Sequence, residues 1–576
     1  MAQNRIMRIS VIFIGIAMLL FSAVYVSAAP ETKFKLGDDL LVLGHDKRQL
    51  TLYLGLSTSD VKLAELPGGI VVHVVAAPRV VGSRTWIRVR GYPVEGWTLV
   101  QQNGKDVFSL YTEKLDAEVT AQAEAAQAKN PMDGEAYFQM GIIHMNHKKY
   151  EAAVNAFISA NENDNGELDS ALIRYFRGLA YSNLKRYSEA LSDLNTALLL
   201  DPDRMFFYTE IGNVYSALGK YQLTIDILDQ AISRNKYYLP AHNNRGIALT
   251  KIGNTEEALK EYNFVLSAEP LYARVYNNRG LLYKSRGQFA QAVRDLQKAV
   301  QIEPDYVDAV VNLADVYGQI GKYDDAFKTY RKAINLAPNY GWTYFRRAYV
   351  YITIGDYENA ETDLKKSILL DATNVDAFYN LGTLYYEQSM YQEAVDNLSI
   401  AIRMDPFYLG AYQNRGLSYK GLGQYDEAIN DFTSALRIKP DFVLAYIERC
   451  AVYSALADDR AVIEDCSAAL RLSPYSVSAL YYRAMAYRWS NHEAEAIADY
   501  KLLVELDPDH AADYYDQIGS MSIALERYQD ALEAYEQYVK LKPEAGDFYK
   551  DTIQFLKDMI DLEVATPEST PEATPT

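Results

Sequence analysis

Apolar and small residues recur along most of this chain with a period of 34 residues, from about Gly134 to Ala545. One period, residues 375–408, reads VDAFYNLGTLYYEQSMYQEAVDNLSIAIRMDPFY. Self-similarity at this period is typical of helix–turn–helix units that stack, because a single unit of this size cannot bury its apolar face alone. The pattern therefore predicts about twelve stacked helical pairs.

Small residues hold two facing positions in the period, the eighth and the twentieth, as Gly382 and Ala394 do. Bulk at either position would hold the two helices of a unit apart. Tyrosine fills the eleventh position in most units, where we expect it in the core. A glycine such as Gly219 usually ends the first helix, and a proline such as Pro202 marks the turn between units.

These coincident positions resemble tetratricopeptide repeats. The resemblance implies a mainly α fold, a right-handed α-solenoid of about twelve repeats over residues 134–545. It also implies that partner peptides bind along the inward face of the first helices, and that the array is not an enzyme. The lysine and arginine constellation with which some members grip a terminal carboxylate is not found.

Asparagine recurs at the sixth position of the repeats on this inward face, and Arg346 interrupts the series. An asparagine amide both donates and accepts, so it can pair with the backbone of an extended peptide of any sequence. The alternative is that these amides are solvated or brace the adjacent unit. Exposed aromatic side chains are common anchors for partners, although packing within the superhelix is the alternative. The candidate groove residues are Asn244, Asn278, Asn312, Arg346, Asn380, Asn414, Trp342, Phe345, Tyr379, Tyr386, Tyr481, Tyr482 and Trp489.

The N-terminus has the three parts of a secretion signal. Arg5 and Arg8 precede an apolar run, and small residues end at Ala28. Residues 1–28 are therefore predicted to be a signal peptide, and the alternative is an uncleaved membrane anchor. Either interpretation places the protein outside the cytoplasm, secreted or associated with the cell envelope.

Residues 30–112 contain short runs rich in β-branched and aromatic residues, separated by turn signals such as Pro67-Gly68-Gly69. Six such strands predict a small all-β barrel. The runs VKLAELPGGIVVHVV, RTWIRVR and EGWTLV resemble the bacterial Src-homology-3-like domain of secreted and envelope proteins.

Three further segments complete the predicted organisation. Residues 113–133 are rich in Ala, Glu and Gln and predict a helical linker, which ends at an Asn-Pro step. Residues 546–564 are expected to form a helix that caps the solenoid. Residues 565–576, rich in Thr, Pro and Glu, have the composition of a disordered tail.

Composition excludes several classes of function. The 57 basic and 76 acidic residues give a net charge of −19, so nucleic acid is an unsuitable partner. No phosphate-binding loop, nucleophile elbow or zinc-protease motif occurs, and we expect no catalytic site, no cofactor and no metal. The pair His144 and His147 lacks a clear third ligand.

Cys450 and Cys466 are the only cysteines, and they occupy facing positions of one repeat. An oxidising compartment would allow a disulfide between them, and two buried thiols are the alternative.

The sequence as a whole predicts an exported, non-catalytic scaffold whose groove binds a protein or peptide. The alternative is an envelope protein that binds cell-wall glycan through its N-terminal barrel, because aromatic side chains stack on sugars as readily as they anchor peptides. A membrane partner is expected only if the N-terminal segment is not cleaved.

Overall fold

The computed structural model describes nine short strands between residues 39 and 110, followed by residues 113–164, 166 and 168–565. Side chains are described from Asp116 to Leu562, apart from 165 and 167. The predicted signal segment 1–28 and all but the first residue of the predicted tail lie outside the described residues. Within the described residues, no helix combines the length and the apolarity needed to span a bilayer.

The strands pair in two antiparallel sheets, a seven-stranded sheet with the order β3-β2-β6-β5-β4-β1-β9 and a two-stranded sheet of β7 and β8. Their bounds are β1 (Asp39–Val42), β2 (Leu50–Tyr53), β3 (Lys62–Leu66), β4 (Val71–Val81), β5 (Arg84–Gly91), β6 (Val94–Leu99), β7 (Gln101–Gln102), β8 (Lys105–Asp106) and β9 (Phe108–Leu110). The connections and all side chains of this segment lie outside the described residues. The predicted Src-homology-3-like barrel therefore stays a prediction.

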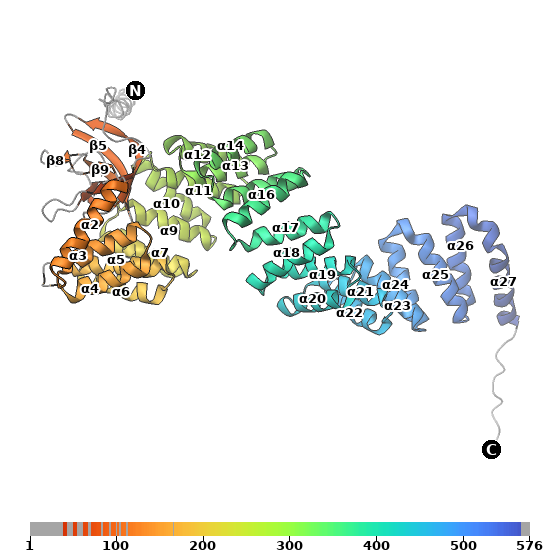
Figure 1. Ribbon diagram of the computed structural model, residues 1–576. Helices are drawn as coiled ribbons and strands as arrows, with labels where there is room; N and C mark the ends of the chain where they lie inside the picture. The colour runs from red at the N-terminus through yellow and green to blue at the C-terminus, as the bar shows by residue number, and fades with distance from the viewer. Residues whose placement is uncertain are drawn as a thin grey trace, which may run out of the picture. The chain divides into compact units, whose positions relative to one another are not determined.

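The rest of the described chain is helical, and most of the helices form antiparallel pairs, which confirms the predicted solenoid of helical repeats (Figure 1). The first helices of the twelve pairs are α3 (Gly134–Asn146), α5 (Ser170–Asn183), α7 (Met205–Ala217), α9 (Leu239–Lys251), α11 (Ala273–Ser285), α13 (Val307–Gln319), α15 (Gly341–Thr353), α17 (Val375–Glu387), α19 (Leu409–Gly421), α21 (Val443–Ala455), α23 (Val477–Trp489) and α25 (Ala511–Ala524). The second helices are α4 (Tyr150–Glu162), α6 (Tyr187–Leu200), α8 (Tyr221–Arg234), α10 (Thr255–Ala268), α12 (Phe289–Ile302), α14 (Tyr323–Leu336), α16 (Tyr357–Leu370), α18 (Tyr391–Met404), α20 (Tyr425–Ile438), α22 (Asp459–Leu472), α24 (Glu493–Leu506) and α26 (Tyr528–Leu541).

Close contact between the two helices of a pair depends on the small residue at the eighth position. A Cβ added at Gly382 would lie 2.6 Å from Leu398 Cγ on the facing helix. Thr224 replaces the usual alanine at the twentieth position of its repeat, and its buried hydroxyl donates to Gly212 O at 3.2 Å. The larger residue is accommodated because its polar atom has a partner.

A residue in the left-handed backbone region ends the first helix of the repeats, as the glycine pattern predicts. Gly219 has φ +70° there, and Ala457 has φ +55° in one of the six repeats that have another residue in place of the glycine. Ala457 adopts a conformation that is unfavourable for a residue with a Cβ. The fold therefore imposes the same turn even where the sequence does not supply a glycine.

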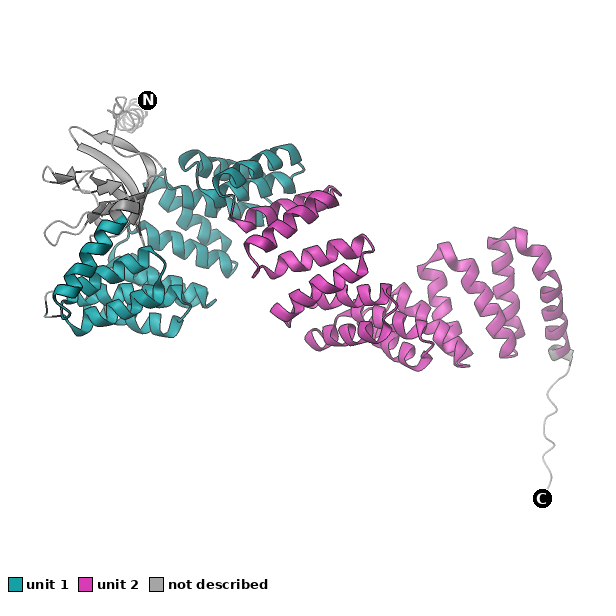
Figure 2. Ribbon diagram, in the orientation of Figure 1, with its two compact units in different colours: residues 1–338 teal, residues 339–576 magenta. Residues whose placement is uncertain are grey.

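Two compact units divide the chain, residues 1–338 and residues 339–576 (Figure 2). In the first unit one apolar cluster runs from Phe138 on α3 to Ala241 on α9. In the second unit another runs from Val443 on α21 to Ala534 on α26. Each of these two clusters therefore spans several repeats.

Helices outside the repeats cover both ends of the described array. α2 (Glu113–Lys129) packs Ala123 and Val119 against α3 and is therefore more than a linker. His147 Nε2 lies 2.7 Å from Asp116 Oδ2 on α2, which gives this histidine a structural partner. The 3-10 turn η1 (Pro508–His510) precedes α25, and η2 (Pro543–Ala545) precedes α27 (Gly546–Ala565), which buries Leu556 against α26.

Candidate peptide-binding surface

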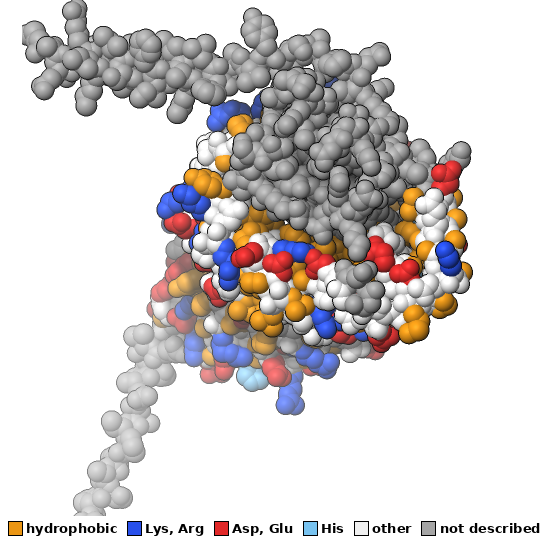
Figure 3. All heavy atoms as spheres, turned by 90° about the vertical axis from the view of Figure 1, so that its left-hand side faces the viewer, with side chains coloured by type: hydrophobic (Ala, Val, Ile, Leu, Met, Phe, Trp, Pro, Cys, Tyr) orange, Lys and Arg blue, Asp and Glu red, His pale blue; other side chains and the backbone are white. Residues whose placement is uncertain are grey.

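The first helices of neighbouring repeats contact one another within each unit, for example α7 with α9 and α21 with α23. All the predicted groove residues lie on first helices, in one unit or the other. Lys and Arg side chains are interspersed with Asp and Glu on the face that Figure 3 shows. This mixed pattern differs from the single-sign stripe that follows a nucleic-acid backbone.

The predicted asparagines of the first unit are hydrogen-bonded to the preceding repeat. Asn278 Nδ2 donates to Asn243 Oδ1 at 2.9 Å, and Asn312 Nδ2 donates to Asn277 Oδ1 at 2.8 Å. Asn244 Nδ2 donates to Asn213 Oδ1 at 2.9 Å. The bracing alternative therefore describes these amides, because their Nδ2 groups hold adjacent first helices together.

In the second unit Asn414 has the same bracing role. Its Nδ2 donates to Thr383 Oγ1 at 2.8 Å on the preceding repeat. Asn380 is half-buried on α17. Arg346 lies over the ring of Trp342, with 5.6 Å between its Cζ and the ring centroid.

Four predicted aromatic anchors contact one another or the core of the second unit, although Trp342 remains 40% exposed. Phe345 is only 7% exposed and belongs to the core around Ala348, so its assignment to the groove is wrong. The Trp342 ring packs against Phe345 at 5.1 Å between centroids. The half-buried Tyr379 and Tyr386 pack against the same core.

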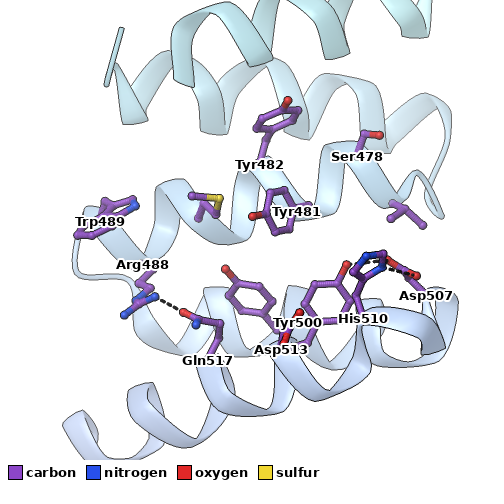
Figure 4. A pocket seen from close by; sticks show the side chains of 13 residues that line it. Ser478, Tyr481, Tyr482, Arg488, Trp489, Tyr500, Asp507, His510, Asp513 and Gln517 are labelled. Atoms are coloured by element: carbon purple, nitrogen blue, oxygen red, sulfur yellow. Dashed lines mark hydrogen bonds and ion pairs between the residues drawn. The ribbon is translucent and has the colours of Figure 1, made fainter. Parts of the chain in front are cut away.

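Tyr481, Tyr482 and Trp489 behave differently, because they line a cavity between α23 and α25 (Figure 4). Tyr481 is 40% exposed and Trp489 is 66% exposed. The cavity measures about 520 Å³, within the usual range of ligand sites. The structure thus brings three predicted groove residues together, and α25 supplies the facing wall.

Residues that the sequence did not single out complete this cavity. They are Val477, Ser478, Met485, Arg488, Tyr500, Asp507, His510, Asp513, Tyr514 and Gln517. Tyr500 and Tyr514 are buried beneath it, with 5.9 Å between their ring centroids. Neither stands at the eleventh position of its repeat, and Tyr514 stands at the third position, where most other repeats have alanine.

Charged groups stand at opposite ends of the cavity. At one end Tyr514 Oη donates to Asp507 Oδ2 at 2.7 Å, and His510 Nδ1 lies 3.0 Å from the same oxygen. At the other end Arg488 donates to the side-chain oxygen of Gln517. Figure 4 shows the two ends separated by the tyrosine rings.

The ionisation of these groups follows from their contacts. Burial raises the pKa of Tyr500 to about 12. Burial and the bond to Asp507 also raise the pKa of Tyr514, so both phenols stay protonated near neutral pH. The bonds from Tyr514 and His510 lower the pKa of Asp507, and Asp507 in turn raises the pKa of His510. The site therefore offers hydrogen-bonding, aromatic and charged groups to a ligand.

Buried ion pairs inside the repeats are a second feature that the sequence analysis missed. Arg415 donates from Nε and Nη2 to the two carboxylate oxygens of Asp431, each at 2.7 Å. The pair joins the two helices of its repeat, and Tyr412 and Tyr419 flank the guanidinium. The same spacing of sixteen residues recurs in the pairs Arg177–Asp193, Arg279–Asp295, Arg347–Asp363, Arg449–Asp465 and Arg483–Asp499. That recurrence at two fixed repeat positions was a readable signal.

Tyrosines at the eleventh position are more exposed than we expected. Tyr385 is buried, but Tyr419 and Tyr351 are half-buried and lie beside the arginines of the ion pairs. They shield the guanidinium groups as well as filling the core.

Cys450 and Cys466 are joined by a disulfide, with 5.9 Å between their Cα atoms. Both residues are fully buried between α21 and α22. Among the described residues, no group of three or more His, Cys, Asp or Glu side chains is arranged to hold a metal ion.

Family comparisons agree with this architecture. Models described as tetratricopeptide repeat or TPR repeat match residues 171–204, 273–306, 314–355, 349–389, 376–406, 410–442, 478–510 and 512–544. The chain therefore carries tandem tetratricopeptide repeats. Such repeats generally act as protein–protein interaction scaffolds and are typically non-catalytic.

Similar solved structures cover parts of the chain. The chain in the crystal structure of MamA is 27% identical in sequence, and the match covers 29% of this chain and 92% of the MamA chain, with a TM-score of 0.27. YrrB, described as a TPR protein with an unusual peptide-binding site, is 21% identical over 32% of this chain and 95% of its own, with a TM-score of 0.27. PilF from Pseudomonas aeruginosa is 21% identical over 35% of this chain and 92% of its own, with a TM-score of 0.32. No curated protein matches the sequence.

Proposed function

We propose that this protein is an exported, non-catalytic scaffold that binds a protein or peptide partner in the cavity between α23 and α25. The observation that carries the proposal is the cavity itself, where the exposed rings of Tyr481 and Trp489 meet polar groups from the next repeat. Aromatic side chains in a concave site are the usual anchors of protein recognition. The asparagines now have a structural role, so the proposed site moves away from them.

Two observations support export. Residues 1–28 have the composition of a secretion signal. The disulfide between Cys450 and Cys466 is the kind of bond that persists outside the reducing cytoplasm. Mass spectrometry of the chain recovered from an envelope fraction should find an N-terminus at Ala29, and an intact Met1 would contradict cleavage.

Site-specific crosslinking can test the binding site in the full-length protein. A photoreactive amino acid at Ser478, exposed at the cavity edge, should capture a partner in the envelope. The same group at Tyr475, which is 70% exposed but does not line the cavity, is the matched control.

The captured protein is then purified and its affinity measured directly. We expect Tyr481→Ala to weaken binding about tenfold or more, because a central aromatic anchor is lost. The variant Tyr475→Ala should bind like the wild type. Equal binding by all three proteins would exclude this cavity as the site. Recovery of cell-wall glycan alone, retained by residues 30–112, would favour the alternative glycan-binding function.

A further inference from the structure

The cavity between α23 and α25 has a direction, because its two ends carry groups of opposite charge. Ser478 lies in the first turn of α23 beside Asp507 and His510, and Arg488 lies in the last turn beside Gln517 (Figure 4). Ten residues of helix separate Ser478 from Arg488, which corresponds to roughly 15 Å. An extended peptide covers that distance with about five residues.

Arg488 marks the cationic end. Its hydrogen-bond partner is the neutral amide oxygen of Gln517, and its guanidinium lies 5.5 Å from the centroid of the Trp489 ring. Within the described residues, no carboxylate lies within ion-pairing distance of it. A guanidinium has five N–H donors, so donors remain available for a carboxylate in the cavity.

Asp507 marks the opposite end, where it accepts from Tyr514 and contacts His510. Asp513, one turn before Gln517 on α25, lies between the two ends and pairs with Lys542 at 2.6 Å across the exposed rim (Figure 4). The Asp513–Lys542 pair is solvated, and exposed pairs of this kind exchange partners at little cost. A cationic side chain of a ligand can therefore take a place beside these two carboxylates.

Between the ends, the tyrosines form a cleft with tilted walls. The Tyr481 ring makes an interplanar angle of 65° with Tyr482 and 55° with Tyr514. The Tyr500 hydroxyl points into the space between the helices (Figure 4). Such a cleft suits an inserted side chain better than a sugar ring, which stacks on a flat exposed platform.

Resting on the proposed peptide-binding function, we infer that the cavity binds an extended segment of about five residues with opposite charges at its ends. The carboxylate of the segment lies at Arg488, and its lysine or arginine lies at Asp507, on the side of Asp513. An aromatic or aliphatic side chain between them inserts among the tyrosines. The cavity thus selects its ligand by the placement of charge as well as by apolar contact.

Fluorescent five-residue probes can test this selection on the full-length protein. Each probe is blocked at both ends, with phenylalanine third and glycine second and fourth. The probes differ only in their first and last residues. Two mixed-charge probes carry lysine and glutamate in opposite orders, and three others carry two lysines, two glutamates or two glutamines. We expect one of the two mixed-charge probes to bind wild type roughly three- to tenfold more tightly than the two-lysine, two-glutamate or two-glutamine probe.

Charge reversal at one end supplies the decisive comparison. The variant Arg488→Glu should come to prefer the two-lysine probe, and Arg488→Gln should lose preference without reversing it. Arg471→Glu, at an exposed arginine of α22 outside the cavity, controls for net charge and should keep the wild-type order. Circular dichroism confirms that each variant is folded.

Several results would overturn the inference. These are an order of affinities that Arg488→Glu leaves unchanged, equal binding of all probes, or no binding below ~1 mM. Displacement from the cavity by an N-acetylglucosamine tetramer but by no peptide would also overturn it. If the purified partner still depends on Tyr481 while the probes show no charge order, the peptide-binding function stands and only the charge selection fails. If neither depends on the cavity, both proposals fail.

Discussion

Removing the disulfide between Cys450 and Cys466 should loosen one repeat by a predictable amount. The bond closes a segment with a sequence separation of 16 residues. For a loop of that length, the loss of chain entropy in the unfolded state corresponds to about 3 kcal/mol. Because each repeat contacts mainly its neighbours, the effect should concentrate on α21 and α22.

A matched variant separates the covalent link from the packing. In the preceding repeat, Gly416 and Phe432 occupy the positions of the two cysteines, and the Phe432 ring fills the space above the glycine. The variant Cys450→Gly with Cys466→Phe therefore restores that packing without a bond. It should give the same stability with or without reductant.

Native-state hydrogen exchange is the assay, because it reports the opening of single helices. The wild-type chain is compared after oxidative refolding and after refolding in reductant. We expect amides of α21 and α22 to exchange up to about a hundredfold faster in the reduced chain, which follows from about 3 kcal/mol. Equal exchange rates in the two forms would refute the argument from loop closure, whatever the global stability.

Two further predictions concern ion pairs. Arg415→Ala should destabilise its repeat by about 3–5 kcal/mol in denaturant unfolding, because it leaves the Asp431 side chain, 6% exposed, charged and unpaired. The double variant Arg415→Leu with Asp431→Thr should recover most of that loss. An Arg415→Ala variant as stable as the wild type would contradict the role of the pair. The second prediction concerns pH. Asp507 holds the pKa of His510 above its ordinary value of 6.5, so the positive charge of His510 is present at low pH and is lost as pH rises through that raised pKa. Affinity for the mixed-charge probe that binds best should therefore increase as pH rises from ~5.5 to ~8, because the lysine of the probe then no longer competes with a charged His510 for the carboxylates. The variant His510→Gln should remove this dependence on pH. An affinity that falls as pH rises would contradict the assignment.

The repeat period predicted most of the helical fold because its signals reinforce one another. Val375 was placed at the start of a repeat, and α17 begins there. A small residue at the eighth position and an alanine at the twentieth require close contact between the two helices of a repeat. Glycine and proline mark the turns. These coincident signals together identify the helices and the turns of each repeat.

The candidate site was predicted only in part, for two physical reasons. An asparagine amide on an inward face satisfies a peptide backbone or a neighbouring side chain equally well, so the sequence left the partner of Asn278 open. The fifth position of the first helix was also misjudged. Asn243, Asn277, Phe345 and Gln413 all occupy it and are all buried, because it faces the adjacent repeat. Tyr481 occupies the same position but stays exposed, a difference that only packing against α25 reveals.

The ion pairs inside the repeats also bear on how such a chain reaches its native state. Twelve similar helical pairs in one polypeptide invite a first helix to pack with the second helix of a different repeat. Repeats with Arg and Asp at the paired positions stand beside repeats with Leu313 and Thr329, or Leu381 and Asn397, at the same places. A mismatched pair would bury Asp363 without Arg347, at a cost of several kcal/mol. The ion-pair positions therefore disfavour packing between a helix from a repeat with Arg and Asp and a helix from a repeat without them.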